Sequence, residues 1–271
     1  MNEPLVLIDN ADAHIAVLTL NRAAKRNALS IGLMEELTEA VRATSGDPNR
    51  RVLILRGAEP VFCAGLDLKE AQHSANSERS ARALAALYEA ICLSPLVTIA
   101  AAQGAAMGGG VGLLAACDVV VVAEDLQIGF PEVRRGLVAA LVTALLARQV
   151  PVRPLREAIL LGQTVSAERA LGMGMVNRVV PRDRLAAEAA ALAEQALKAA
   201  PVSIARTKLL FDELSARPIT TDLARAVRYH LDARDDSEAA EGIAAFLEGR
   251  EPRWKPRPPG ASGQTGSGGQ A

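Results

Sequence analysis

Short apolar runs alternate with amphipathic stretches along the first two thirds of the chain. Four runs are rich in β-branched or small apolar residues and end at turn-forming residues, which is typical of buried strands: residues 14–20, 51–57, 96–102 and 119–123. Between these runs, apolar residues recur at spacings of three and four, which predicts helices. Strands that alternate with helices pair in parallel through crossover connections, so the pattern predicts an α/β core.

Three amphipathic helices are predicted within this core. Ser30 is a suitable N-cap for the first of them, because its hydroxyl can accept a hydrogen bond from the first turn. Their apolar stripes are Ile31, Met34, Leu37 and Val41; Leu84, Leu87, Tyr88 and Ile91; and Leu141, Val142, Leu145 and Leu146. A shorter helix is expected to lead from a glycine-rich loop to Ala116.

The C-terminal third has a different pattern. Strand signals stop after about residue 183, and Leu185–Ala200 consists of strong helix formers. The last residues are rich in Pro, Gly and Ser, a composition that cannot bury a core. We therefore expect an α/β core over residues 1–195, a helical region over 196–255 and a disordered tail over 256–271.

Composition narrows the classes of function. The formal net charge is −1 and only 3% of the residues are aromatic, so neither a basic field nor a base-stacking surface favours nucleic acid. The three cysteines have no CxxC spacing and are expected to be reduced thiols. With no signal peptide apparent, this predicts a cytoplasmic protein.

One segment raises the question of a membrane span. Residues 90–117 carry no charge and are long enough to cross a bilayer. Pro95, several polar residues and the glycines interrupt the segment, which favours a buried strand–turn–helix unit. No membrane partner is therefore expected.

Several common catalytic motifs are absent from the sequence. His14, His73 and His230 have no metal-ligand spacing, and neither a GxSxG nor a GxxxxGK[ST] motif occurs. A GxGxxG fingerprint starting at Gly108 would need glycine where Leu113 stands. We expect no metal and no nicotinamide cofactor.

Three stretches remain as candidates for a functional site. "FCAGLDLKE" (Phe62–Glu70) and "QGAAMGGGVG" (Gln103–Gly112) each place a glycine turn after a predicted strand, and Asp67 could cap the helix that follows the first. Free N–H groups at two such turns could together form an oxyanion hole. "IGFPEVRRG" (Ile128–Gly136) carries Glu132 after a proline. Taken singly, glycine clusters commonly serve packing, and a Pro–Glu pair is commonly a solvated helix start.

Taken together and in this order, the stretches resemble the enoyl-CoA hydratase/isomerase (crotonase) superfamily. The matching segments are "TLNRAAKRNALS", "FCAGLDLKE", "AAQGAAMGGGVGLLAACDVVVVAED", "FPEVRRGL", "SAERALGMGMVNRVVP" and "EGIAAFLEGREPRWK". The resemblance implies a crotonase-like spiral of ββα turns whose C-terminal helical region mediates trimerisation. It also implies an acyl-CoA thioester as the substrate, coenzyme A as part of that substrate and no other cofactor, and a homotrimer or a hexamer of paired trimers.

The resemblance also assigns site residues. The backbone N–H groups of Leu66 and Gly109 would bind the thioester oxygen, and Glu132 would be the acid/base. The CoA site would be lined by Lys25, Ala28, Ala64, Gly65, Asp67 and Leu68, with Arg22 and Arg26 beside Lys25 near the phosphates.

The chain departs from the family pattern at Gly112. Typical hydratases carry a first glutamate two residues after the glycine triplet, and a positioned acid or base contributes about 10²–10⁴-fold to the rate. Glu132 alone could still move a proton between two carbons, so double-bond isomerisation and hydration of an enoyl-CoA both stay open. Its apolar sequence neighbours Phe130 and Val133 predict a raised pKa. Dehalogenation is disfavoured, because Ala139–Ala140 offers no nucleophilic aspartate.

A different class of function is a catalytically weak acyl-CoA-binding homologue that has lost hydratase activity. The presence of Glu132 favours an enzyme over a binding protein, because a protein that only binds acyl-CoA needs the glycine loops but not this carboxylate. The sequence therefore favours an enzyme.

Overall fold

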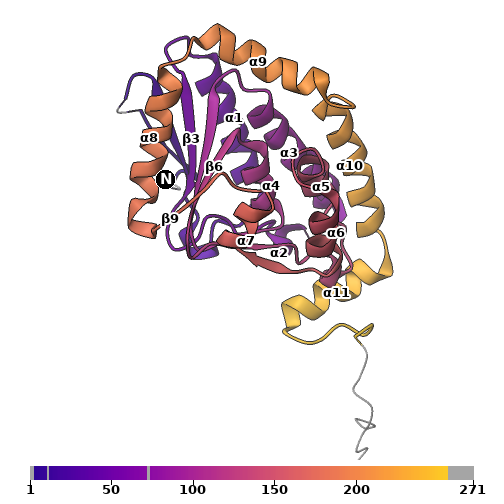
Figure 1. Ribbon diagram of the computed structural model, residues 1–271. Coiled ribbons are helices and arrows are strands. Elements are labelled where there is room, and N and C mark those ends of the chain that lie inside the picture. The colour runs from indigo at the N-terminus through magenta and orange to yellow at the C-terminus, as the bar shows by residue number, and fades with distance from the viewer. Residues whose placement is uncertain (1–2, 11, 72–73, 256–271) are drawn as a thin grey trace, which may run out of the picture.

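Six strands form the central sheet of the computed structural model, which describes residues 3–10, 12–71 and 74–255 (Figure 1). In spatial order they are β1 (Val6–Asp9), β2 (Ile15–Leu20), β3 (Val52–Gly57), β4 (Val97–Ala102), β6 (Val119–Ala123) and β9 (Arg178–Val180). β1 is antiparallel to β2, and the other neighbours are parallel. The four strands expected from the apolar runs are thus confirmed as β2, β3, β4 and β6, and they pair in parallel as predicted.

Helices cover both faces of this sheet. Because side chains alternate along a strand, Val52 and Ile54 face α8 (Leu185–Leu197), whereas Leu53 and Leu55 belong to the main core. α1 (Ile31–Gly46), α3 (Ser74–Cys92) and α4 (Gly109–Ala116) pack on that second side, opposite α8 (Figure 1). The predicted cap of α1 is present, since Ser30 Oγ accepts from the Leu33 amide at 3.2 Å.

A second, three-stranded sheet carries the loops of interest. It consists of β5 (Ala105–Met107), β7 (Gln127–Gly129) and β8 (Thr164–Ser166), with β5 parallel and β8 antiparallel to β7. β5 ends directly before the glycine triplet, and β7 ends directly before the segment that bears Glu132. These strands were not predicted, because three residues are too few to show a period of two.

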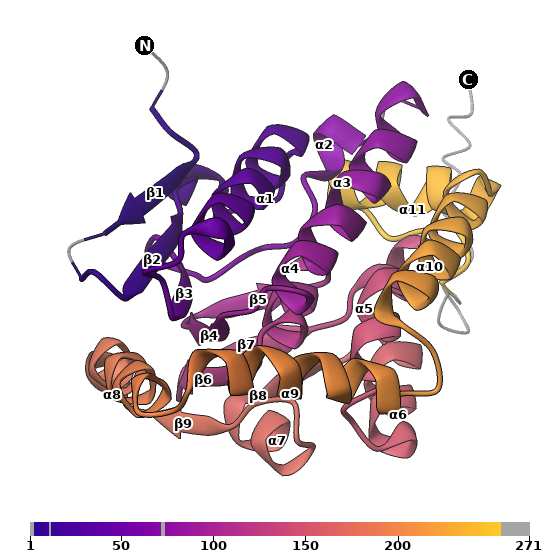
Figure 2. The same cartoon turned by 90° about the horizontal axis from the view of Figure 1, so that it is seen from above.

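The remaining helices lie around this frame. They are α2 (Leu68–Ala71), α5 (Ala140–Leu146), α6 (Val152–Leu160), α7 (Ala167–Gly172), α9 (Pro201–Leu214), α10 (Ile219–Arg234) and α11 (Ser237–Glu248), with the 3₁₀ helices η1 (Ala23–Lys25), η2 (Glu132–Arg135) and η3 (Arg182–Arg184). α9 runs along the outer side of the molecule between α8 and α10, as Figure 2 shows. α10 packs on α3 and α5, and α11 packs on η2.

The C-terminal third is helical, as expected. Among the described residues, those after β9 form helices and connecting turns without a strand. The boundary expected at 195–196 falls inside α8, and the tail over 256–271 lies outside the described residues. In the part of the chain that the structure describes, no helix combines the length and hydrophobicity needed to cross a bilayer.

Candidate active site

Two glycine loops meet at the edge of the sheets. Gly65 has φ +90°, and a Cβ atom there would lie 2.7 Å from Met107 O and 3.7 Å from the Gly109 amide nitrogen. Only glycine satisfies both the positive φ and this approach of backbone to backbone. The structure therefore brings the Phe62–Glu70 and Gln103–Gly112 stretches into direct contact, as the oxyanion-hole hypothesis requires.

Backbone hydrogen bonds fix the relative position of these loops. The Leu29 amide donates to Gly65 O at 2.8 Å, and the Asp67 amide donates to Leu29 O at 3.0 Å. The Met107 amide donates to Cys63 O at 3.0 Å. These backbone bonds link the two glycine loops to each other and to the turn at Leu29.

Two amides of these loops, those of Leu66 and Gly109, have no acceptor among the described residues. Between described residues, neither donates a hydrogen bond, whereas the amides of Asp67 and Gly108 both do. Gly109 begins α4, and the first amides of a helix have no partner within the helix. Two unsatisfied donors thus lie on adjacent loops, which is the arrangement needed to bind a negatively charged oxygen.

Glu132 lies close to the same loops. Gly108 has φ +46°, and a Cβ atom there would lie 2.6 Å from Glu132 Oε1. Glu132 Oε2 is buried and has no hydrogen-bond partner within the described residues. Burial raises the pKa of Glu132 to about 7, which confirms the predicted direction. A carboxyl group with this pKa can both accept and release a proton near neutral pH.

A small cavity of about 50 Å³ joins these groups. Its walls are mainly apolar, and its ionisable side chains are Glu132, Arg135 and His230. The predicted site residues that line it are Ala64, Gly65, Leu66, Leu68, Gly109 and Glu132. Sequence reasoning missed both Arg135, although it lies within the Ile128–Gly136 stretch, and His230, which comes from the distant helix α10.

The other three predicted residues lie in or beside the adjoining turn. Lys25 is exposed at the end of η1, and Ala28 O accepts from Arg22 Nη1 at 2.5 Å. The Asp67 carboxylate forms an ion pair with Arg22 at 3.2 Å. This contact replaces the helix cap expected for Asp67, because Arg22 lies within reach of the carboxylate. A capping hydrogen bond from Asp67 to α2 is not found among the described residues.

Asn27 organises that turn and was also missed. It is fully buried with φ +53°, and its Nδ2 donates to Ala58 O at 2.7 Å and to Val61 O at 2.8 Å. Its Oδ1 accepts from the Arg22 amide at 3.0 Å. Asparagine adopts a positive φ more readily than most residues. An asparagine within residues 25–29 ("KRNAL") was therefore the one sequence signal that a tight turn forms there.

The C-terminal helix α11 supports the turn that bears Glu132. A Cβ atom at Gly242 would overlap Arg135 O, so the helix and η2 touch through their backbones. The Arg135 guanidinium lies 3.9 Å from the ring centroid of Phe246, a cation–π contact. Residues more than 100 positions apart in the sequence thus hold Glu132 in place.

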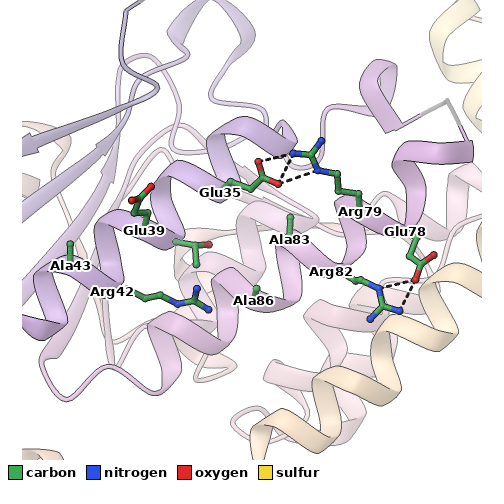
Figure 3. Close-up of a pocket in the computed structure, with 10 residues that line it drawn as sticks. Glu35, Glu39, Arg42, Ala43, Glu78, Arg79, Arg82, Ala83 and Ala86 are labelled. Carbon is green, nitrogen blue, oxygen red and sulfur yellow. Dashed lines mark hydrogen bonds and ion pairs between the residues drawn. The ribbon is translucent and has the colours of Figure 1, made fainter.

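A larger groove lies elsewhere, between α1 and α3. It measures about 1090 Å³, and Figure 3 shows two ion pairs among the charged side chains that line it. Glu35 pairs with Arg79 at 2.8 Å, and Glu78 pairs with Arg82 at 2.6 Å. None of the predicted site residues lines this groove, so size alone does not identify the functional cavity.

Within the part of the chain that the structure describes, the cysteines and histidines outside this cavity do not gather into a second site. The three cysteines are free, and burial raises the pKa of both Cys63 and Cys92 to about 12, so these thiols stay protonated. His14 is exposed, and His73 lies outside the described residues. A search of the described residues finds no group of three or more His, Cys, Asp or Glu side chains that could hold a metal ion.

The fold and this site together define an α/β protein with two unpartnered backbone amides beside a buried carboxyl oxygen. A model of the enoyl-CoA hydratase/isomerase family matches residues 10–257. The chain is 34% identical to the mevalonyl-coenzyme A hydratase of Aspergillus fumigatus over 259 residues, which are 92% of this chain and 94% of that protein. It is 30% identical to the mouse mitochondrial methylglutaconyl-CoA hydratase over 256 residues, covering 92% and 82% of the two chains.

Solved structures agree with the sequence comparison. The crystal structure of an enoyl-CoA hydratase from Mycobacterium avium superposes with a TM-score of 0.83 at 31% identity, covering 93% of this chain and all of that chain. The chain therefore belongs to the enoyl-CoA hydratase/isomerase family and has the crotonase fold. It is thus an enzyme of the lyase or isomerase kind that this family comprises.

Proposed function

We propose that the protein acts on an enoyl-CoA thioester with one carboxylate and two backbone amides. The thioester oxygen accepts hydrogen bonds from the Leu66 and Gly109 amides, and Glu132 transfers a proton at a carbon beside the thioester carbonyl. The observation that carries this proposal is that the unpartnered Glu132 Oε2 shares a cavity with both loops.

The two amides supply the electrostatic part of the reaction. When a proton leaves or joins the α-carbon, negative charge develops on the thioester oxygen as an enolate. Donors fixed in advance stabilise that charge without reorganising, and one such donor contributes about 10²–10³-fold to the rate. Leu66 and Gly109 act through backbone atoms, so Gly65 and Gly108 matter because they allow the required backbone conformation.

Glu132 performs the proton transfer. In double-bond isomerisation, its carboxylate takes a proton from one carbon and the resulting acid returns it to another. In hydration, protonated Glu132 gives its proton to the α-carbon, the oxygen of water bonds to the β-carbon, and the carboxylate left on Glu132 takes up the proton that this water loses. Hydration needs a group that orients the water, and Gly112 cannot be that group. Substrate polarity or a water network would have to replace it.

The coenzyme A moiety is proposed to lie along the turn next to the cavity. Ala64, Asp67 and Leu68 would contact the adenine, with Ala28 and Gly65 alongside, and Lys25 would face the phosphates. The exposed ammonium of Lys25 supports this placement, because a phosphate can approach it from solvent. No cofactor other than the substrate's own coenzyme A enters the proposal.

We also propose that identical copies of the chain associate into a trimer or a pair of trimers. α9 supports this proposal, because it contains no buried residue although half of its residues are apolar. Phe211 and Leu214 are 71% and 75% exposed. Light scattering after size exclusion would test it, and a monomeric mass at micromolar concentration would refute it.

The test of function is a screen of unsaturated acyl-CoAs with the wild type and Glu132→Gln. We expect turnover of at least one enoyl-CoA by the wild type and a loss of about 10²–10⁴-fold in the variant. Turnover of none, together with measurable binding of a CoA thioester, would favour the alternative of a catalytically weak acyl-CoA-binding homologue.

A further inference from the structure

Tyr88 occupies the space into which a side chain at position 112 would project. A Cβ atom on Gly112 would overlap the hydroxyl oxygen and Cζ of Tyr88 and would lie 2.8 Å from Cε2. Heavy atoms do not approach so closely, so no residue larger than glycine fits at 112 while Tyr88 keeps its rotamer. Position 112 is therefore a glycine because a tyrosine from α3 fills its place.

The Tyr88 hydroxyl contacts the glycine loop itself. The side chain is fully buried, and its hydroxyl donates to Gly109 O at 2.7 Å. Burial raises the pKa of this phenol well above its ordinary value, so the hydroxyl keeps its proton and remains a donor. A buried donor that loses its acceptor is costly, which ties the two groups together.

The position of this bond gives it a functional consequence. Gly109 O and the Gly109 amide belong to the same residue, and the amide is one of the two unsatisfied donors described above. Tyr88 does not line the cavity, so it contacts Gly109 from the buried side. It can restrict rotation of the residue without obstructing the approach of a ligand to its amide.

We propose that Tyr88 is a positioning residue for the oxyanion hole. It fills the place of a side chain at 112 and fixes Gly109 by a hydrogen bond, so that the Gly109 amide faces the cavity. Where the family pattern has a carboxylate that would orient water, this chain has Gly112, with the Tyr88 ring in the space that a side chain there would need. The inference rests on the proposed function, because it assumes that the Gly109 amide binds the thioester oxygen.

The first experiment removes only the hydroxyl, with Tyr88→Phe. A neutral hydrogen bond of this kind corresponds to about 3–10-fold, so we expect kcat to fall by that factor while KM changes less than twofold. Tyr229→Phe is the matched control, because Tyr229 is 61% exposed on α10 and should leave both constants unchanged.

A spectroscopic readout separates positioning from general stability. Acetoacetyl-CoA has an acidic α-carbon, and its enolate absorbs in the near ultraviolet, so a site that binds enolates raises the bound enolate fraction. We expect Tyr88→Phe to lower that fraction at fixed pH and full saturation, and Tyr229→Phe to leave it unchanged. An enolate fraction and kcat equal to the wild-type values in Tyr88→Phe would overturn the role of Tyr88.

The failure of the underlying function would look different. If wild-type protein bound acetoacetyl-CoA without any enolate band and turned over no enoyl-CoA, the oxyanion hole itself would be refuted, and Tyr88 with it. An active wild type with an unaffected Tyr88→Phe refutes the Tyr88 inference alone.

A double-mutant cycle tests the claim about space. Gly112→Ala should lower the melting temperature strongly in the wild type and much less in the Tyr88→Ala background, because the colliding ring is then absent. An equal loss in both backgrounds would overturn the claim that Tyr88 excludes a side chain at 112. This cycle needs no catalytic activity and stays informative if Tyr88→Phe is poorly expressed.

Discussion

The carboxylate of Glu132 lies against the backbone of Gly108, so close that a Cβ atom at Gly108 would stand 2.6 Å from Glu132 Oε1. This contact joins the acid/base candidate to the glycine triplet, one residue from the Gly109 amide. The candidate acid/base and the candidate oxyanion donor therefore line the same small cavity. Predictions about the reaction follow from that proximity.

The pH dependence of kcat/KM should distinguish isomerisation from hydration. The pKa of Glu132 is raised to about 7. If the reaction begins with proton removal by the carboxylate, kcat/KM rises as pH increases through about 7. If it begins with proton delivery, kcat/KM falls over the same range. A profile flat between pH 6 and 8 with a rate-limiting chemical step would contradict the acid/base role of Glu132.

The same residue should lower the stability of the fold above pH 7. The pKa of Glu132 rises from 4.5 in the unfolded chain to about 7 in the folded protein. The stabilisation from the protonated form is thus complete below pH 4.5 and is lost as pH rises to about 7. At pH 8, Glu132→Gln should therefore be more stable than the wild type by up to about 3 kcal/mol in the free energy of unfolding. It should accordingly unfold at a higher temperature.

At pH 4.5 the wild type and Glu132→Gln should unfold at nearly the same temperature. Calorimetry at pH 4.5 is therefore the control for the comparison at pH 8. Equal stability at both would mean that Glu132 is not buried in solution as the structure has it.

A side chain at Gly109 should abolish turnover. A Cβ atom there would lie 3.2 Å from Leu29 Cδ1 and 3.6 Å from Leu84 Cδ2, so the added methyl groups of Gly109→Val must displace the loop. We expect kcat/KM to fall by at least about 10²-fold, the contribution of one oxyanion donor. Gly172→Val is the control, because a Cβ atom at Gly172 meets nothing within 4 Å. Unchanged kcat/KM in Gly109→Val would refute the assignment.

Asn27 should be important for stability. Asn27→Ala removes three hydrogen bonds of the turn over residues 22–28 and places an alanine at φ +53°. We expect a loss of about 2–4 kcal/mol, measured by chemical denaturation. Asn49→Ala, at an exposed position, should cost far less. Similar losses in the two variants would contradict the role given to Asn27.

Reversal of charge at Lys25 should weaken the binding of coenzyme A. Lys25→Glu replaces an attraction to phosphate by a repulsion, so calorimetry should show a higher Kd that approaches the wild-type value as salt is added. Lys198→Glu, at the end of α8, makes the same charge change away from the turn. An unaltered Kd for Lys25→Glu at low salt would remove Lys25 from the site.

Much of the core could be predicted from local pattern. The four apolar runs became β2, β3, β4 and β6, because buried parallel strands must be continuously apolar. Ser30 caps α1 as expected. The short strands β5, β7 and β8 could not be predicted, since their stability comes from pairing with distant strands rather than from their own residues.

The candidate site likewise contains residues that local motifs indicated and contacts that only the folded structure shows. Glycine loops after buried strands pointed to Leu66 and Gly109, and the motif after Pro131 pointed to Glu132. Asp67 was expected to cap a helix, and the structure pairs it with Arg22 instead. Whether Asp67 caps the adjacent helix or pairs with an arginine depends on a residue 45 positions away in the sequence. No local pattern reveals that contact.

By itself the sequence determined the four longer parallel strands, the helices that alternate with them, the two glycine loops and Glu132 as the one candidate acid/base, because these follow from side-chain chemistry and local spacing. Only the tertiary structure decided that Glu132 loses its solvent, that α11 holds its turn and that Tyr88 fills the place of a side chain at Gly112. Burial, pKa and steric exclusion depend on which distant residues meet, and the folded chain alone brings them together.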